Sequence, residues 1–263
     1  MDADSYLAHI GTERPSRIDA DELARLQVAH LLSVPFENLD IWRRRPITLD
    51  LEAVFEKVVR RRRGGFCYEL NGLFAWLLAE LGFQTTMLSA RVVGGSDGEL
   101  GPEFAHLILR VDLETPRLVD VGFGDSFRTP MPLQADSEFV DPLGRMYQLE
   151  RRGDNWDLRE HVDASSESLH VASAPPDDEE WRKQLTFSLT PRVLADFEPM
   201  CRWQQTESPF FTQHRFCTIA TADGRRTLMD RRLIVRSGGR KEEREVEEHE
   251  VSDLLRTLFG VRL

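Results

Sequence analysis

Cys67 has the sequence surroundings of a nucleophilic thiol. It follows Gly64 and Gly65 and precedes a segment, 70–81, in which apolar residues recur at helical spacing. Cys67 should therefore lie in or just before the first turn of a helix. Because unpaired backbone N–H groups and the helix dipole stabilise an anion at a helix N-terminus, we expect this thiol to ionise more easily than a free cysteine. The two glycines would leave room for a substrate, and nearby N–H groups could hold an oxyanion. The alternative interpretation is that Cys67 is a small buried apolar residue.

Among the seven histidines, His106 is the best candidate partner for this thiol. It opens the apolar segment 105–113, so its ring is expected to be held in place rather than free in solvent. Asp120 lies in a second apolar segment, 117–121, where an unpaired carboxylate would be costly to bury. If the two segments pair as strands, the Asp120 carboxylate can accept the imidazole N–H of His106 and stabilise its protonated form.

A thiol, an imidazole and an orienting carboxylate together make an activated nucleophile for acyl transfer. We therefore predict that Cys67, His106 and Asp120 form a catalytic triad. The order Cys, His, Asp occurs in several unrelated thiol enzymes, so the spacing by itself does not select a reaction. A buried hydrogen-bonded network without catalytic function is the alternative for the same residues.

Composition argues against several other classes of function. The 263 residues carry a net charge of −11, which disfavours nucleic acid or an anionic membrane as the main partner. The three cysteines contain no C-x-x-C pair, so neither a disulfide framework nor a metal site is predicted. The N-terminus is acidic, and no apolar run is long enough to cross a bilayer. These features predict a cytoplasmic protein with no membrane partner.

The elements that must position the triad change in type along the chain. Up to residue 84 helical periodicity dominates, with helices expected at 5–10, 21–32, 51–60 and from Cys67 onwards. The next part favours an antiparallel sheet or small barrel, with strands expected at 85–93, 105–113, 117–121, 146–151 and 156–159. The last part is mixed, with a helix starting at Thr190 and Pro191, strands at 216–221 and 227–235, and a terminal helix at 252–259.

Sequence motifs around the triad resemble the arylamine N-acetyltransferase family. The most specific motif is RGGFCYELN at 63–71, which is followed by AHL at 105–107 and VDVGFG at 119–124. The resemblance extends to VPFENL at 34–39, QTESP at 205–209, FCTI at 216–219 and the C-terminal helix. It therefore covers nearly the whole chain.

The resemblance implies an α+β fold with a cysteine-protease-like Cys-His-Asp site. An N-terminal helical bundle, 1–84, would carry Cys67. A central antiparallel β-barrel, 85–189, would carry His106 and Asp120. A C-terminal α/β lid, 190–263, would complete the site.

The resemblance also implies a ping-pong reaction with acetyl-CoA as the acyl donor and a role in xenobiotic metabolism. The Cys67 thiolate would take the acetyl group, and an aromatic amine, a hydrazine or an N-hydroxyarylamine would then accept it. His106 would manage the proton, and Asp120 would keep the imidazole in the right tautomer. Aromatic amines suit this reaction because they are neutral near pH 7 and can attack without first losing a proton.

Family positions suggest contacts beyond the triad. Three phenylalanines match positions near the acceptor ring: Phe36, Phe66 and Phe123. Trp203 matches a position near the CoA. Gly124 and Ser126 are expected to contact the cofactor as well, because their loop, 122–126, lies next to Asp120 and offers backbone N–H groups. Glu103 departs from the family pattern, because it places a negative charge near the expected position of the acyl-CoA.

Two other enzyme classes could use the same triad. An amide synthase of natural-product assembly would take the acyl group from a carrier protein and use an internal aromatic amine. A transglutaminase-like or papain-like thiol hydrolase would pass the acyl group to water or to a lysine amine. The oligomeric state is left open between a monomer and a homodimer.

Overall fold

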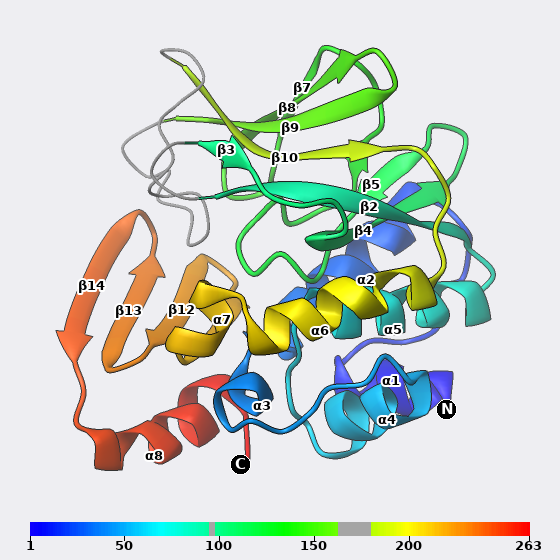
Figure 1. The fold of residues 1–263 in the computed structure, drawn as a ribbon. Helices are drawn as coiled ribbons and strands as arrows, with labels where there is room; N and C mark the ends of the chain where they lie inside the picture. The colour runs from blue at the N-terminus through cyan, green and yellow to red at the C-terminus, as the bar shows by residue number, and fades with distance from the viewer. Residues whose placement is uncertain (95–97, 163–179) are drawn as a thin grey trace.

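The computed structural model describes residues 1–94, 98–162 and 180–263, which form an α+β fold (Figure 1). Helices dominate the first third of the chain: α1 (Ala3–His9), α2 (Ala20–Ser33), α3 (Leu39–Trp42), α4 (Leu51–Phe55), a π-helical turn η1 (Glu56–Arg60) and α5 (Cys67–Glu80). Asp19 caps α2, since its carboxylate accepts the N–H of Glu22 at 3.0 Å. The helices predicted at 5–10, 21–32 and 51–60 are thus present within a few residues of their expected bounds.

The middle of the chain forms a nine-stranded antiparallel sheet that is strongly curved. Its strands are β2 (Gln84–Gly94), β3 (Glu99–Leu100), β4 (His106–Asp112), β5 (Arg117–Val119), β6 (Met131–Pro132), β7 (Ser137–Val140), β8 (Met146–Arg152), β9 (Asn155–His161) and β10 (Trp181–Ser188). They are ordered β6-β5-β4-β2-β10-β9-β8-β7, with β3 paired to β2. The sheet encloses a core that includes Leu88, Ile108 and Leu185, and Figure 1 shows it above α2 and α5.

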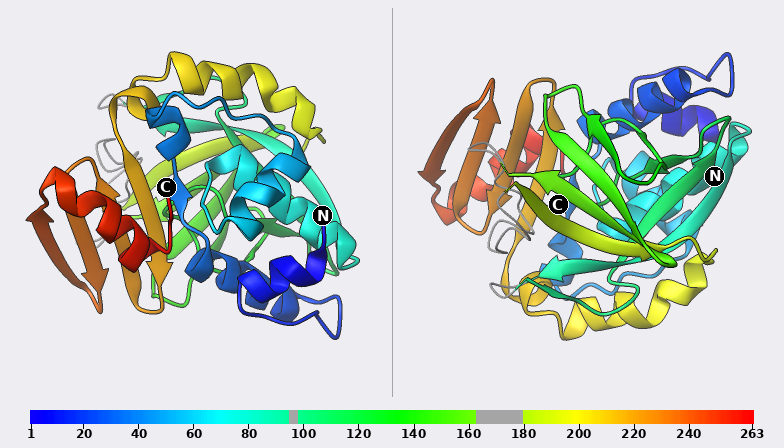
Figure 2. Two further views of the ribbon diagram at one scale, coloured as in Figure 1. Left: turned by 90° about the horizontal axis from the view of Figure 1, so that it is seen from below. Right: turned by 90° about the horizontal axis from the view of Figure 1, so that it is seen from above.

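The last third of the chain combines a second sheet with helices. The helices are η2, a 3-10 turn (Leu194–Phe197), α6 (Glu198–Thr206), α7 (Pro209–Gln213) and α8 (Glu248–Phe259), and the strands are β11 (Phe216–Thr221), β12 (Gly224–Met229), β13 (Arg232–Ser237) and β14 (Arg240–Glu245). Helix α8 buries Val251, Leu255 and Phe259 in a core shared with this sheet, and Figure 2 shows α8 lying along it. The amphipathic pattern predicted at 252–259 therefore has its partner surface here.

A short strand from the N-terminal part completes the second sheet. In β1 (Phe36–Glu37), Phe36 pairs with Thr218 and Glu37 with Cys217 of β11. Phe36 also forms a parallel bridge to Gly65, just before α5. The region 1–84, predicted to be a helical unit, therefore contributes an edge strand to the C-terminal sheet, and the chain leading into Cys67 is tied to that sheet.

Two local predictions for the C-terminal part were wrong. Residues 190–193 are not helical, because the N–H of Arg192 donates to the carbonyl of Met87 at 2.9 Å, and the helical turn starts at Leu194 instead. The carboxylate of Asp196 accepts the N–H of Val193 at 2.9 Å and so caps that turn. The strand predicted at 227–235 is two strands, β12 and β13, joined by a turn in which Asp230 has a φ of 51°.

Within the described ranges, no helix is long and apolar enough to span a membrane. The same ranges contain no group of three or more His, Cys, Asp and Glu side chains that could hold a metal ion.

Candidate active site

Cys67 is the first residue of α5, as the helical periodicity predicted. Phe66 precedes it in extended conformation, and its N–H donates to Oε2 of Glu69 at 3.1 Å. This contact, one half of a capping box, fixes the direction in which the chain enters the helix. Only 3% of Cys67 is exposed, yet it lines a pocket of about 450 Å³ that His106 also lines.

His106 and Asp120 meet across paired strands. Because β4 pairs with β5 in the register Leu109 to Val119, His106 at the start of β4 lies beside Asp120, which directly follows β5. Nε2 of His106 is 2.7 Å from Oδ2 of Asp120, and both residues are buried. The ring of Phe123 packs edge-to-face on the imidazole, with 5.2 Å between the ring centroids. With Nε2 facing the carboxylate, Nδ1 is the nitrogen left to exchange a proton with Cys67.

Asn71 holds the other oxygen of this carboxylate, and sequence reasoning gave it no role. Its Nδ2 donates to Oδ1 of Asp120 at 2.9 Å and to the carbonyl of Leu107 at 2.6 Å. The N–H of Gly122 also donates to Oδ1 of Asp120, at 2.8 Å. These donors fix the orientation of the carboxylate and pair its second oxygen. The sequence did contain a signal for this role. Asn71 is a polar residue one helical turn after Cys67, in a helix that is otherwise apolar on that face.

Burial raises the pKa of the Cys67 thiol well above its ordinary value, and Cys201 and Asp120 add to the rise. Hydrogen bonds from the backbone N–H groups of Leu107 and Tyr68 lower the pKa of the thiol, but by less than burial raises it. The expectation that the isolated thiol ionises easily was therefore wrong, because loss of water outweighs the helix N-terminus. A thiolate can form here if its proton moves to His106, since the imidazolium then neutralises the new charge.

The space beside Gly64 and Gly65 is filled by the protein itself. A Cβ on Gly64 would lie 2.1 Å from the carbonyl oxygen of Pro35, and one on Gly65 would lie 2.9 Å from Oε2 of Glu69. The prediction that these glycines leave room for a substrate was wrong, since they allow the chain to pack closely as it enters α5. Gly122 has the same function beside the nucleophile, because a Cβ there would lie 2.9 Å from Cα of Cys67.

A buried network of charged side chains lies behind the start of α5. Nζ of Lys57 is 2.9 Å from Oε1 of Glu69 and 2.8 Å from Oδ2 of Asp40. The guanidinium of Arg63 is 2.7 Å from Oε1 of Glu37 and 3.2 Å from Oδ1 of Asp40. Burial raises the pKa of Glu69, and Lys57 opposes that rise. The network joins η1, β1 and α5, so it fixes the chain on both sides of the two glycines.

The pocket wall contains three of the six contact residues expected beyond the triad. Phe36, Phe123 and Trp203 line the pocket, whereas Phe66, Gly124 and Ser126 do not. Phe66 is fully buried and packs edge-to-face on Tyr68, with 5.1 Å between the ring centroids, and the Ser126 hydroxyl donates to Gln184 at 3.2 Å. Other parts of the wall come from residues to which the sequence gave no role: 92–94, 101–102, Ala105, Gln204, Ser208, Phe210, Phe211 and Met229.

Gln204 places an unpaired acceptor in this wall. Its Nε2 donates to the carbonyl of Ala105 at 2.8 Å, which fixes the orientation of the amide. Its Oε1 is buried and has no hydrogen-bond partner among the described residues. Buried acceptors are almost always paired in folded proteins, so this oxygen is suited to a donor on a bound molecule.

Glu103, which the sequence placed as a negative charge near the acyl-CoA, is paired. Its Oε1 is 2.8 Å from the guanidinium of Arg192 and accepts the Ser89 hydroxyl at 3.3 Å. The guanidinium of Arg192 also lies over the Phe104 ring, 4.9 Å from its centroid. The charge of Glu103 is therefore balanced within the chain.

Comparisons with known proteins agree with the motifs and the fold. The chain matches the N-acetyltransferase family over residues 19–263. It is 33% identical to arylamine N-acetyltransferase 1 from Homo sapiens, over 100% of this chain and 95% of that protein. The solved arylamine N-acetyltransferase of Mycobacterium smegmatis is 35% identical with a TM-score of 0.86, covering 100% of this chain and 93% of that one. The solved arylamine N-acetyltransferase of Mycobacterium marinum in complex with CoA is 31% identical with a TM-score of 0.84, covering 99% of this chain and 93% of that one. The chain therefore belongs to the arylamine N-acetyltransferase family.

Proposed function

We propose that the protein transfers an acetyl group from acetyl-CoA to arylamines, arylhydrazines or N-hydroxyarylamines through an acetyl-cysteine at Cys67. The observation that carries this proposal is the buried pair of His106 and Asp120, with 2.7 Å between Nε2 and Oδ2. His106 lies in the wall of the pocket that Cys67 also lines. Membership of the family supports the reaction class, and the relative solved with CoA supports the donor.

In the first half-reaction, His106 takes the thiol proton of Cys67 at Nδ1 while Asp120 holds Nε2–H. The Cys67 sulfur then attacks the thioester carbonyl carbon. A new C–S bond forms, the original thioester C–S bond breaks, and the leaving thiolate receives the proton from His106. The N–H groups of Leu107 and Tyr68, which lower the pKa of Cys67, stabilise its thiolate before the attack.

In the second half-reaction, the amine nitrogen attacks the acetyl carbon on Cys67. An N–C bond forms as the C–S bond breaks, the amine proton moves to His106, and this proton restores the thiol. A flat apolar acceptor fits the aromatic walls formed by Phe36, Phe123 and Phe211. Its neutral nitrogen needs no prior deprotonation, so His106 has to accept a proton only as the N–C bond forms.

The residues present also suit an acyl-CoA donor. Acetyl-CoA supplies the activated acetyl group. The unpaired Oε1 of Gln204 offers an acceptor for an amide or amine N–H, and Trp203, which is 37% exposed, offers an aromatic surface next to it. These contacts would hold the donor while its acyl end reaches Cys67.

The experiment that tests the function is intact-mass analysis after a brief incubation with acetyl-CoA, followed by peptide mapping. We expect one acetyl group, on Cys67, that disappears when an aromatic amine is added. Cys67→Ser should show no adduct, whereas Cys201→Ser, which alters another buried thiol, should acquire and lose the acetyl group as the natural protein does.

Other outcomes separate the competing enzymes. Acylation of Cys67 by a carrier-bound acyl chain but not by acetyl-CoA would favour the amide synthase. Peptide hydrolysis or transamidation without CoA would favour the thiol hydrolase. An adduct on another residue would overturn the assignment of the nucleophile.

A further inference from the structure

The hydroxyl of Tyr68 reaches the chain just before His106. Tyr68 directly follows Cys67 in α5, is fully buried, and is not among the described residues that line the active-site pocket. Its hydroxyl donates to the carbonyl of Phe104 at 2.7 Å and lies 3.3 Å from the carbonyl of Ala105. Burial raises the pKa of this hydroxyl well above its ordinary value, so it keeps its proton near pH 7 and remains a donor. The helix of the nucleophile is therefore bonded to the chain that leads into the base.

The segment that Tyr68 holds has a strained backbone. Phe104 has a φ of 63°, in the left-handed region that residues other than glycine rarely adopt. Its ring packs edge-to-face on Phe197, with 5.3 Å between the ring centroids, and the guanidinium of Arg192 lies 4.9 Å from its centroid. The Tyr68 ring contacts the same Phe197, with 5.6 Å between the centroids. Strained backbone persists only where the surrounding contacts determine it, so loss of the Tyr68 hydroxyl should loosen this turn.

The chain after His106 is held by the same helix. Asn71, one helical turn after Tyr68, donates from Nδ2 to the carbonyl of Leu107 at 2.6 Å. Tyr68 and Asn71 therefore hold the backbone on both sides of His106, and both belong to the helix whose first residue is Cys67. A proton passes between Cys67 and Nδ1 of His106 only at hydrogen-bond distance, so a shift of this backbone relative to α5 acts directly on the transfer.

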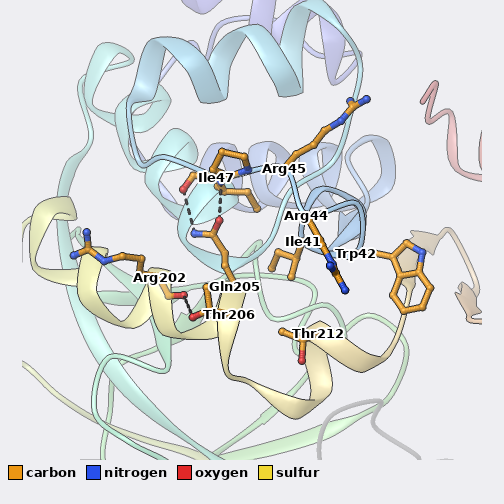
Figure 3. A pocket seen from close by; sticks show the side chains of 10 residues that line it. Ile41, Trp42, Arg44, Arg45, Ile47, Arg202, Gln205, Thr206 and Thr212 are labelled. Carbon is orange, nitrogen blue, oxygen red and sulfur yellow. Dashed lines mark hydrogen bonds between the residues drawn. The ribbon is translucent and has the colours of Figure 1, made fainter.

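A second helix shares the carbonyl of Ala105. Nε2 of Gln204 in α6 donates to it at 2.8 Å. The next residue fixes α6 in place: Oε1 of Gln205 accepts the N–H of Ile47 at 2.7 Å, and its Nε2 donates to the Ile47 carbonyl at 3.1 Å, as Figure 3 shows in the wall of a neighbouring pocket. The Ala105 carbonyl thus keeps Gln204 when the Tyr68 hydroxyl is removed. We therefore expect that removal to weaken the positioning of the segment without unfolding it.

We propose that Tyr68 is a positioning residue, whose hydroxyl sets the distance between Cys67 and His106 through the carbonyls of Phe104 and Ala105. It acts through the backbone of the base rather than on a substrate. The inference rests on the proposed function for the identity of the reacting pair, but the pair can be measured without acetyl-CoA. A hydroxyl that served the fold alone would change only the stability, whereas a positioning hydroxyl changes the pH at which Cys67 becomes reactive.

The pH dependence of Cys67 alkylation tests this role without any acyl donor. Iodoacetamide is added to the natural protein, Tyr68→Phe and His106→Gln between about pH 5 and pH 9, and peptide mapping follows the adduct on Cys67. We expect Tyr68→Phe to react about 3-fold to 10-fold more slowly near pH 7 and to recover at higher pH, because one neutral hydrogen bond contributes up to about tenfold. Formation of the acetyl-cysteine should slow by a similar factor, with the KM for acetyl-CoA unchanged.

Two other buried tyrosines are matched controls, because each can lose its hydroxyl in the same way. The hydroxyl of Tyr6 in α1 is 2.8 Å from Nδ1 of His30 in α2, so Tyr6→Phe removes a buried hydrogen bond between those helices. The hydroxyl of Tyr147 is buried without a hydrogen-bond partner among the described residues, so Tyr147→Phe removes none there. Tyr6→Phe should lower the urea midpoint about as much as Tyr68→Phe does, and both controls should keep the natural alkylation profile.

The outcomes separate positioning from stability and from the reaction itself. An alkylation profile of Tyr68→Phe equal to that of the natural protein would overturn the proposal. An equal shift in Tyr6→Phe would overturn it too, because loss of stability alone would then explain the change, as would natural reactivity in His106→Gln. If acetyl-CoA leaves the natural protein unmodified while Tyr68→Phe alone shifts the profile, the proposed function is wrong and the positioning role stands.

Discussion

Replacing Lys57 with methionine tests the buried charged network behind Cys67. Nζ of Lys57 lies 2.9 Å and 3.1 Å from the two carboxylate oxygens of Glu69. Methionine keeps an unbranched apolar side chain but has no ammonium group. In this variant Glu69 stays buried and keeps its contact with the N–H of Phe66, but it loses its cation. Arg63 cannot replace that cation without leaving Glu37, which it contacts at 2.7 Å.

The expected loss of stability is large because one charge is left without its partner. Breaking a buried ion pair by removing one member costs about 3–5 kcal/mol. We expect Lys57→Met to lose about 3 kcal/mol of unfolding free energy near pH 7, at the lower end of that range, since Glu69 can take up a proton. The double variant Lys57→Met/Glu69→Gln carries no charge at either position, so it should recover about 1–2 kcal/mol of that loss.

The loss should shrink as the pH falls. Burial already raises the pKa of Glu69 in the folded protein, and removing Lys57 raises it further. A carboxyl with a raised folded pKa binds more protons when folded than when unfolded. The stability that this carboxyl contributes is therefore fully present below its pKa in the unfolded chain. It is lost as the pH rises through its pKa in the folded protein. Between pH 7 and pH 5 the deficit of Lys57→Met should decrease by at most about 1.4 kcal/mol per pH unit.

Urea unfolding followed by tryptophan fluorescence at pH 5, 6 and 7 measures these differences. The set comprises the natural protein, both single variants and the double variant. Arg61→Met is the matched control, because its side chain is 64% exposed and its ion pair spans 3.8 Å, so it should change stability by less than about 0.5 kcal/mol. Strictly additive single variants, or a Lys57→Met deficit that does not vary with pH, would refute the reasoning.

Four further substitutions test the candidate active site. Asp120→Asn should lower kcat on the order of 10³-fold while circular dichroism shows a folded protein, because an amide cannot hold His106 in the same tautomer. A kcat equal to that of the natural protein would show that Asp120 is not the orienting acid. Asn71→Ala should cost about 2 kcal/mol in urea unfolding and lower kcat, since Asp120 and a buried N–H lose a partner; unchanged kcat would disprove the orienting role. Gly122→Ala should cost about 1–3 kcal/mol, because its Cβ would meet backbone atoms of Cys67, and should slow alkylation of Cys67 by iodoacetamide. Gln204→Leu should raise KM for acetyl-CoA or for the amine about tenfold in steady-state assays, with little change in kcat; unchanged KM for both would show that Oε1 meets no substrate donor.

Local signals accounted for much of the fold. Helical spacing and the change to short apolar segments predicted α2, α5 and most strands of the large sheet, because these elements bury one continuous face. The charged strand β14 was missed, since all six of its residues are exposed and no apolar alternation marks it. Strand β1 was missed because two residues cannot show a period.

The sequence by itself determined which groups could do the chemistry. Cys67 at a helix start follows from glycines and helical spacing. The pairing of His106 with Asp120 follows from two apolar strands joined by a short turn. Both are consequences of contacts between segments that are close in the chain.

The tertiary structure alone decided what surrounds those groups. Gln204 approaches the pocket from 98 residues beyond His106, and the network of Lys57 and Glu69 depends on how η1 packs against α5. The pKa of Cys67 was predicted with the wrong sign, because the helix terminus is a local feature whereas burial is the sum of every segment packed around the thiol. Long-range packing sets desolvation and distant hydrogen bonds, and no local spacing in the sequence encodes either.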